Sequence, residues 1–468
     1  MEAEASGSRE ALRGLGLRIP VAWLASQRWF AGKARTLTGI ALRDAAPLPG
    51  TSGEPDAFVL LEDVAYADGG VETYALPMVA EAEATTLRPP NDGDGVWRRL
   101  ARLVHTGGEM RGSAGSFRFE PAERSPGAQE PAAEAATERT LGAEQSNTAV
   151  ALDDVLFLKL YRRLEPGESP EVELARFLNE QARFRGTPRL HGSAHYVSAD
   201  GRPWALAILQ DLVAAEGSAW EFLVDRLRDV MARSGSPSFT LLRRDLAALG
   251  SVTGDLHRAL ASAPSEAFPV RPASADERER WVASARDQLG RAREAVRGRD
   301  RERLTDLEPA IVNAFEPLRD AARPATVSRI HGDYHLGQLL RVGRSFVVTD
   351  FEGEPARPLA ERRRPHSPLK DVAGMLRSLD YAGLTAARRM GANDSGSLYA
   401  ERWWTYAVGA FVEPYARSAG QVPDRALLRA FAVEKACYEV AYEAANRPEW
   451  LWLPILGLER LLATLAAG

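Results

Sequence analysis

The chain has 468 residues, 45% of them hydrophobic, and a formal net charge of −5 at pH 7. This length predicts two or three domains or subdomains, and the charge balance gives no basic footprint for nucleic acid. The single cysteine, Cys437, excludes an intrachain disulfide framework and a cysteine-cluster zinc site. The acidic N-terminus does not read as a signal peptide, and no apolar run is long enough for a membrane span. A cytoplasmic soluble protein is therefore expected.

Residues 1–90 are predicted to form a small α+β module. A helical pattern runs to about Gln27, an aromatic turn follows at 28–33 (RWFAGK), and strand-like runs cover 58–61 and 71–78. Gly, Pro and Asp residues separate these runs, as is typical of turns. We interpret the aromatic turn as two packed rings beside a solvated lysine, and the sequence assigns it no catalytic role.

Residues 91–213 are predicted to form a nucleotide-binding lobe. A helix at 96–105 and a strand at 117–119 precede a loop at 121–138 that is rich in Pro, Ala and Glu. A strand, a polar loop and two further strands then lead to residue 160. This order places the polar loop where a kinase folds a loop over the nucleotide phosphates.

The polar loop, residues 142–148 (GAEQSNT), lacks the Walker A pattern and holds one glycine. Backbone cradling of a phosphate is therefore not indicated. We predict instead that the side chains of Ser146, Asn147 and Thr148 donate hydrogen bonds to the nucleotide. An ordinary hairpin turn is the alternative.

Lys159 lies within an apolar strand, where a lysine must snorkel, pair or meet a ligand. Kinases place such a lysine on the nucleotide phosphates and hold it with a glutamate from a helix. The helix that begins after Ser169 offers Glu173, the preferred partner, and Glu171, the second choice. The alternative is that both glutamates serve the helix dipole.

A strand of the buried type, residues 204–209, leads through Gln210, Asp211, Leu212 and Val213 to helices. A kinase hinge meets adenine at the corresponding point. We therefore predict that backbone groups of these four residues bind the base.

Residues 214–326 carry amphipathic helical patterns and little recognisable chemistry. His257 lies beside an apolar helix face and is predicted to be a packing histidine rather than a ligand. The charged helices predicted near 276–298 and 302–321 are expected to face solvent.

The most informative stretch begins with His331-Gly332-Asp333, continues to Gln338, and forms a predicted hairpin that ends on Asp350-Phe351-Glu352. Phosphoryl transfer needs a group that accepts the hydroxyl proton, and ligands that hold Mg²⁺ against the phosphates. Asp333 is therefore predicted to be the catalytic base, and Gln338 and Asp350 the Mg²⁺ ligands. A surface hairpin with ordinary charges would not explain the three features together.

Two helices further on complete the predicted site. Asp371, early in the first, is predicted to brace the catalytic loop; a plain helix-terminal charge is the alternative. The second helix carries polar and aromatic groups on one face, where an apolar stripe is usual. Such groups suit a sugar, although a tyrosine-lined helix packed on the core is the alternative. The face consists of Lys435, Tyr438, Glu439 and Tyr442.

These motifs resemble the aminoglycoside-phosphotransferase-like branch of the kinase superfamily and, over nearly the whole length, the actinobacterial maltokinases. The more specific ones are RWFAGK (28–33), ERRRPHSPLKDVAGMLRSLDYA (361–382) and KACYEVAYEAANRPEW (435–450). Gln338 departs from the Asn of the wider superfamily, but HLGQ resembles the maltokinase version.

The resemblance implies an α+β, bilobal, protein-kinase-like fold. It implies an N-terminal cap (1–90), a nucleotide-binding N-lobe (91–213) and a mostly helical C-lobe (214–468). The acceptor contacts are then assigned to Asp333, His335, Glu352, Lys435, Tyr438, Glu439 and Tyr442.

The resemblance also implies that ATP, with Mg²⁺, phosphorylates maltose at the anomeric hydroxyl. The product, maltose 1-phosphate, would feed glycogen and α-glucan synthesis, and a trehalose-converting enzyme is an expected partner. A glucosamine or aminoglycoside kinase is the alternative, although the mixed charges of residues 434–449 favour a neutral sugar. A catalytically dead binding module is disfavoured because Lys159, Asp333, Gln338 and Asp350 are all present.

Overall fold

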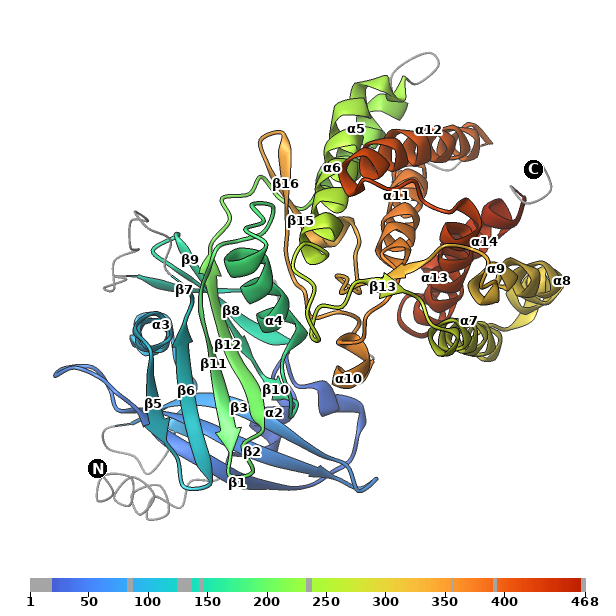
Figure 1. Ribbon diagram of the computed structural model, residues 1–468. Coiled ribbons are helices and arrows are strands. Elements are labelled where there is room, and N and C mark those ends of the chain that lie inside the picture. The colour runs from blue at the N-terminus through green and yellow to red at the C-terminus, as the bar shows by residue number, and fades with distance from the viewer. Residues whose placement is uncertain are drawn as a thin grey trace. The chain divides into compact units, whose positions relative to one another are not determined.

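The computed structural model describes residues 19–81, 87–123, 137–142, 146–232, 238–355, 357–389 and 394–463. The chain divides into two compact units: Met1–Glu180 with Pro188–Val213, and Gln181–Thr187 with Ala214–Gly468. Figure 1 shows most strands in the first unit and most helices in the second. The first part of the predicted N-terminal helix, most of the 121–138 loop and residues 143–145 of the polar loop lie outside the described residues.

The first unit begins with an antiparallel sheet in the order β1-β2-β3-β10, with β4 paired to β3. Phe30 is buried against Tyr74, with ring centroids 5.2 Å apart, whereas Lys33 is exposed and donates to the Arg28 carbonyl. The interpretation of the aromatic turn as packed rings beside a solvated lysine is confirmed. The elements are α2 (Val21–Ser26), η1 (Ala31–Ala34), β1 (Leu37–Leu48), β2 (Ala57–Tyr66), β3 (Val71–Ala80), β4 (Leu87–Arg88) and β10 (Arg163–Leu164).

The second sheet of this unit is also antiparallel, in the order β5-β6-β11-β12-β9-β8-β7. Buried Asp44 on β1 ties the two sheets together, because it accepts hydrogen bonds from the Tyr196 hydroxyl (3.0 Å) and from Ser113 N–H (2.6 Å). The elements are α3 (Val96–Thr106), β5 (Gly108–Arg111), β6 (Gly115–Pro121), β7 (Glu138–Leu141), β8 (Asn147–Leu152), β9 (Leu156–Tyr161), α4 (Pro170–Arg176), η2 (Phe177–Gln181), β11 (Leu190–Ser198) and β12 (Pro203–Asp211).

The second unit is mostly helical. Its elements are α5 (Ala219–Met231), η3 (Phe239–Leu242), α6 (Arg243–Leu260), β13 (Arg271–Pro272), α7 (Ala275–Ala295), α8 (Gly298–Ala314), α9 (Glu316–Arg319), β14 (Thr326–Val327), η4 (Leu336–Gln338), β15 (Leu339–Val342), β16 (Ser345–Val348), α10 (Leu359–Arg362), α11 (Leu369–Arg389), α12 (Asp394–Ala419), α13 (Arg425–Asn446), η5 (Pro448–Trp450) and α14 (Trp452–Ala463). None of the described helices combines the length and apolar composition that crossing a membrane requires.

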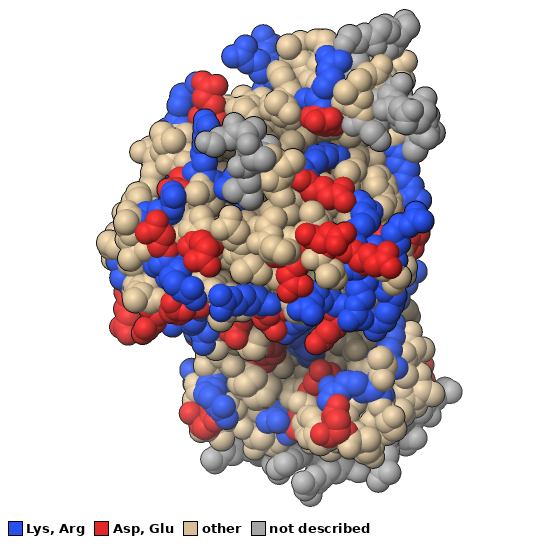
Figure 2. Space-filling model, turned by 90° about the vertical axis from the view of Figure 1, so that its right-hand side faces the viewer, with Lys and Arg blue, Asp and Glu red and all other residues tan. Residues whose placement is uncertain are grey.

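The charged helix α7 corrects one expectation. It was predicted to face solvent, but it buries Trp281, Ala285 and Leu289 and packs against α13. These residues are four apart, so they form a narrow apolar stripe that the surrounding charges conceal in the sequence. Elsewhere the surface is mixed in sign: on the face shown in Figure 2, Lys and Arg side chains interleave with Asp and Glu.

Candidate active site

The predicted catalytic loop is held by one buried carboxylate. Asp371, in the first turn of α11, accepts hydrogen bonds from the N–H groups of His331 (2.8 Å) and Gly332 (2.9 Å). The same carboxylate also contacts the His257 ring, whose Nε2 lies 3.1 Å from Asp371 Oδ2. The helix can come this close because Gly374 has no side chain; a Cβ there would meet the Tyr334 carbonyl oxygen at 2.6 Å. The predicted bracing role of Asp371 and the packing role of His257 are both confirmed.

We expect Asp371→Asn to destabilise the protein, because an amide cannot accept from two N–H groups and His257 at once. Each buried donor left unsatisfied costs about 1–3 kcal/mol. Burial alone would raise the pKa of Asp371, but the bond from His257 and neighbouring positive charge hold that pKa below its ordinary value. The carboxylate therefore stabilises the fold at pH values above its pKa in the unfolded chain, about 3.9. This contribution is lost as the pH falls through the lower pKa of the folded state.

Thermal unfolding of both proteins at pH 7 and near pH 3.5 measures this contribution. The difference in Tm between wild type and Asp371→Asn should be large at pH 7 and should shrink in acid. Asp255→Asn is the matched control, because its carboxylate forms an exposed surface pair with Arg258. A difference in Tm that does not change with pH would show that the Asp371 carboxylate charge is not the stabilising element.

The predicted hairpin brings Gln338 and Asp350 side by side. It forms from β15 and β16, and the Thr349 N–H donates to the Gln338 carbonyl at 2.9 Å. The Gln338 amide Nε2 lies 3.0 Å from Asp350 Oδ2. Asp350 has a φ of +63°, a left-handed conformation that is uncommon for a residue with a side chain and is concentrated at functional sites.

This donor set fits a hard divalent cation. Mg²⁺ prefers carboxylate and carbonyl oxygens and usually takes one or two carboxylates from the protein, leaving positions for water and phosphate. The Asp350 carboxylate and the Gln338 amide supply such atoms next to each other. When bound, the cation would neutralise phosphate charge. Glu352, the third residue of the DFE motif, is partly exposed.

The strand lysine has a glutamate partner, but not the predicted one. Lys159 Nζ lies 2.9 Å from Glu171 Oε2, and both side chains are buried. The Tyr161 hydroxyl donates to the same oxygen at 2.6 Å. Glu171, the second choice, is therefore the partner, and the preference for Glu173 is wrong. The two glutamates are two residues apart, so they point to nearly opposite sides of α4 and only one can face β9.

A double-mutant cycle with Lys159→Met and Glu171→Gln should show strong coupling. Removing either partner leaves the other charge buried, which costs about 3–5 kcal/mol, whereas removing both restores neutrality. Each single variant should also raise KM for ATP and lower kcat. Urea unfolding and steady-state kinetics measure the two effects, and Glu173→Gln is the matched control. Additive losses of stability would show that the ion pair does not act as a unit.

The polar-loop prediction needs correction at one residue. Thr148 is buried on β8, and its hydroxyl accepts a hydrogen bond from Arg162 Nε at 2.7 Å. It therefore belongs to the strand rather than to the loop. Asn147 begins that strand, and its side-chain oxygen accepts from the Arg162 N–H at 3.4 Å. Ser146 is exposed. Nucleotide contacts from Ser146 and Asn147 remain predictions.

The hinge prediction also needs correction for two backbone groups. The Asp211 N–H donates to the Arg189 carbonyl at 2.9 Å, and the Leu212 N–H donates to the Val155 carbonyl at 2.7 Å. These two N–H groups are therefore engaged within the first unit and cannot also bind adenine. The sequence could not show this, because backbone hydrogen bonds leave no mark on residue type. Contacts to the base from Gln210, from Val213 and from the carbonyl groups of Asp211 and Leu212 remain predictions.

In the second unit, α13 brings a lysine to the predicted base. Lys435 Nζ lies 3.4 Å from Asp333 Oδ1 and 3.3 Å from Glu354 Oε1. Its ammonium also lies 4.5 Å from the ring centroid of Tyr438. On the other side of Asp333, His335 Nε2 lies 4.0 Å from Oδ2. The structure therefore brings Asp333, His335, Lys435 and Tyr438 together, as predicted.

Two members of the predicted α13 face lie elsewhere. The Glu439 carboxylate pairs through Oε2 with Arg377 of α11, at 2.8 Å to Nη2 and 2.9 Å to Nε, and it lines neither cavity described below, so its assignment as an acceptor ligand gains no support from the structure. Burial raises the pKa of Glu439, although Arg377 opposes this effect. Tyr442 is 43% exposed and stacks on Tyr438, with ring centroids 6.1 Å apart. It lines neither of the two cavities that Gly332 lines.

Two cavities within the second unit are lined by Gly332 of the HGD motif, and Asp333 lines one of them. A narrow one of about 20 Å³ is lined by Asp333, Lys435 and Tyr438. A wider one of about 890 Å³ shares Tyr438 and Glu354 with it. Residues of both cavities that the sequence did not point to are Gln288, Glu354, Arg357 and Lys370. Gln288 lies on a helix expected to face solvent, and Glu354 could have been suspected only from its position just after the DFE motif.

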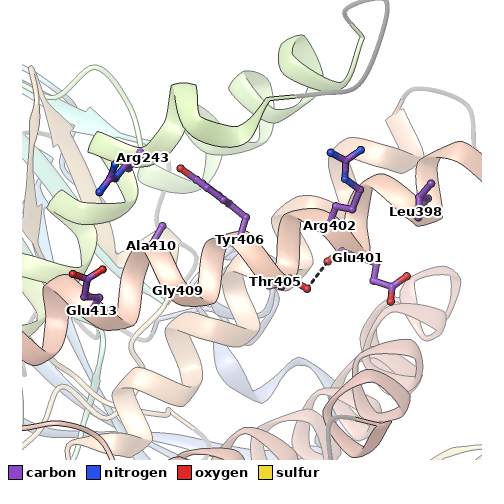
Figure 3. Close-up of a pocket in the computed structure, with 9 residues that line it drawn as sticks. All are labelled: Arg243, Leu398, Glu401, Arg402, Thr405, Tyr406, Gly409, Ala410 and Glu413. Atoms are coloured by element: carbon purple, nitrogen blue, oxygen red, sulfur yellow. Dashed lines mark hydrogen bonds between the residues drawn. The ribbon is translucent and has the colours of Figure 1, made fainter. Parts of the chain in front are cut away.

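A further hollow of about 780 Å³ lies on α12 beside the start of α6 (Figure 3). Its lining includes Arg243, Tyr406 and Glu413, and the Thr405 hydroxyl donates to the Glu401 carbonyl at 3.3 Å. None of the predicted catalytic, nucleotide, metal or acceptor residues lines this hollow.

Comparison with known proteins finds similarity to a maltokinase cap domain and to glucosamine kinases. The model of the maltokinase N-terminal cap domain matches residues 23–90. A glucosamine kinase from Mycolicibacterium smegmatis is 28% identical over 333 residues, which cover 69% of this chain and 79% of that protein. A solved glucosamine kinase, crystal form A, has a TM-score of 0.70 at 25% identity and covers 91% of this chain and 92% of its own.

A glucosamine kinase in complex with glucosamine, ADP and inorganic phosphate has a TM-score of 0.72 at 24% identity, covering 95% of this chain and 99% of its own. The predicted fold class is confirmed: α+β and kinase-like, with an N-terminal cap, sheets in the first unit and a mostly helical second unit.

Proposed function

We propose that this chain, which carries a maltokinase N-terminal cap domain and is a homologue of glucosamine kinases, is an ATP-dependent sugar kinase that phosphorylates maltose at its anomeric hydroxyl. The coarser statement, an ATP-dependent kinase acting on a sugar, is supported by the homologues. The finer statement, maltose, is supported by the cap match and by the charge of the wide cavity.

In the proposed reaction the acceptor hydroxyl approaches Asp333. As the hydroxyl oxygen forms a bond to the γ-phosphorus of ATP, its proton passes to the Asp333 carboxylate. The bond between the γ-phosphorus and the oxygen that bridges it to the β-phosphate breaks. The products are a sugar 1-phosphate and ADP. Catalysis of this kind consists mainly of positioning and of neutralising charge. Lys159, paired with Glu171, would contact the phosphates, and Asp350 with Gln338 would hold Mg²⁺ to offset the phosphate charge.

The observation that carries the choice of acceptor is the charge of the wide cavity. Basic side chains outnumber acidic ones around it: Arg271, Arg280, Arg291, Arg357, Arg362, Arg364 and Lys370 against Glu277, Asp287, Glu354 and Glu361. A basic excess repels a cationic amino sugar and, more strongly, a polycationic aminoglycoside. Its volume of about 890 Å³ lies at the upper end of the range for small-molecule sites, which leaves room for a second sugar ring.

Glucosamine is the second candidate acceptor, favoured by the names of the homologues. A screen of the purified protein with radiolabelled ATP against maltose, glucose, glucosamine and kanamycin separates the candidates. Maltose should give the highest kcat/KM and an acid-labile anomeric phosphate. If glucosamine is preferred instead, the maltose proposal is wrong and the sugar-kinase proposal stands. Transfer to none of the four acceptors would contradict both.

The cellular part of the proposal rests on the family resemblance. A maltokinase supplies maltose 1-phosphate for glycogen and α-glucan synthesis. Association with a trehalose-converting enzyme and a cytoplasmic location remain predictions of that resemblance.

A further inference from the structure

The α13 lysine beside the catalytic loop has a role different from the one the sequence gives it. Asp333 is reached by Lys435 at one oxygen only, Oδ1, at 3.4 Å. Among the described residues, no hydrogen bond reaches Oδ2, and His335 Nε2 lies 4.0 Å from it. The carboxylate is thus held on one side, and its second oxygen is left for a hydroxyl.

Lys435 is itself held in place. Its ammonium lies 3.3 Å from Glu354 Oε1, and the other Glu354 oxygen accepts from Arg357 Nε. Arg357 Nη2 reaches Ser284 Oγ at 3.5 Å, and Ser284 Oγ donates to Glu434 Oε1 at 2.7 Å. The Glu354 side chain is 6% exposed and the Arg357 side chain 26%, so this chain of contacts is mostly buried and links the ammonium to Ser284 of α7.

The charges in this chain are fixed. Burial would lower the pKa of the Lys435 ammonium, but the Glu354 and Asp333 carboxylates more than offset it and raise that pKa above its ordinary value. Burial would raise the pKa of Glu354, but Lys435, Lys370 and Arg357 hold it well below its usual range. Both groups therefore stay ionised at neutral pH, and the ammonium keeps its hydrogen-bonding protons.

From this geometry we infer that Lys435 is a positioning residue, which, anchored by Glu354, orients the Asp333 carboxylate so that Oδ2 faces the acceptor hydroxyl. The inference rests on the proposed function and changes the role of Lys435 from sugar ligand to orienter of the base. A misplacement of a reacting group by about 1 Å can cost about 10²-fold in rate, so the effect should be large.

The two roles predict different kinetics. If Lys435 orients Asp333, Lys435→Met should lower kcat by about 10²-fold with KM for the sugar changed by less than about threefold. Glu354→Gln should lower kcat in the same direction, and the double variant should be less impaired than the product of the two single effects predicts. Arg417→Met, which removes an exposed cation on α12, is the matched control and should leave kcat unchanged.

Chemical rescue separates orientation from a general loss of structure. n-Propylammonium added to Lys435→Ala should restore a measurable part of kcat, whereas n-propanol, which has a similar shape and no charge, should not. The acceptor in every assay is the sugar that wild-type protein phosphorylates best. Failure of maltose as a substrate would therefore refute the maltose proposal and leave this comparison intact.

Three results would overturn the inference. A raised KM for the sugar with kcat unchanged would return Lys435 to the role of sugar ligand. Independent effects of Lys435→Met and Glu354→Gln would show that Glu354 does not anchor the lysine. Absence of rescue by n-propylammonium in a variant that binds ATP normally would show that the loss is structural.

Discussion

Replacing Asp333 by asparagine should lower kcat by about 10²-fold or more and leave ATP affinity nearly unchanged. A positioned general base contributes on this scale, and the amide keeps the shape of the side chain but cannot accept the hydroxyl proton. In the structure Asp333 lines a cavity. Its Oδ1 lies beside the Lys435 ammonium, which also pairs with Glu354. Steady-state kinetics measures kcat, and titration with a fluorescent ATP analogue measures nucleotide affinity.

The matched control is Asp255→Asn, which removes a carboxylate of an exposed pair far along the chain. It should leave kcat unchanged. Near-wild-type turnover of a folded Asp333→Asn protein would remove Asp333 from the reaction, and equal losses in kcat and ATP affinity would point to a distorted site rather than to a missing base.

Asp350→Asn should reduce activity by at least about 10²-fold, the scale on which fixed charges stabilise a transition state. Asparagine is the informative substitution because it tolerates the left-handed backbone at φ +63° better than other residues with a side chain. The variant therefore removes the negative charge with little added strain. Activity measured over a range of Mg²⁺ concentrations should show a higher requirement for the metal.

Two further variants serve as comparisons for Asp350→Asn. Gln338→Ala should cost less, because it removes a neutral ligand rather than a charged one. Asp154→Asn, at another left-handed position but in an exposed turn, should have no effect on activity. Removal of divalent cations with EDTA should abolish wild-type activity, and added Mg²⁺ should restore it. Unchanged Mg²⁺ dependence in Asp350→Asn would contradict the metal assignment.

Short-range sequence patterns were sufficient to predict those parts of the site that residues close together in the chain form. The HGD motif, the amide five residues after Asp333 and the hairpin that ends on Asp350 fix their own geometry, because a tight hairpin places its two ends together. Lys159 on its strand follows from the same kind of evidence, because an apolar strand that contains one lysine calls for a partner.

Helix phase could be read from the sequence only in part. The periodicity of α13 correctly indicates that Lys435, Tyr438 and Glu439 share one side, but that side is wide enough to meet two neighbours. Glu439 pairs with Arg377 of α11, whereas Tyr438 lines the cavity beside Asp333. Packing between helices, which periodicity does not describe, therefore decided which side chains reach the site.

By itself the sequence determined the kinase-like elements, the HGD loop with its hairpin and the neighbouring Gln338 and Asp350, because these depend on short-range spacing. Only the tertiary structure decided that Glu171 rather than Glu173 meets Lys159, and that Lys435 reaches Asp333 across 102 residues. It also brought Gln288 and Glu354 to the two cavities that Gly332 lines. These contacts depend on the relative rotation and packing of whole helices, which residue type and spacing along one chain leave open.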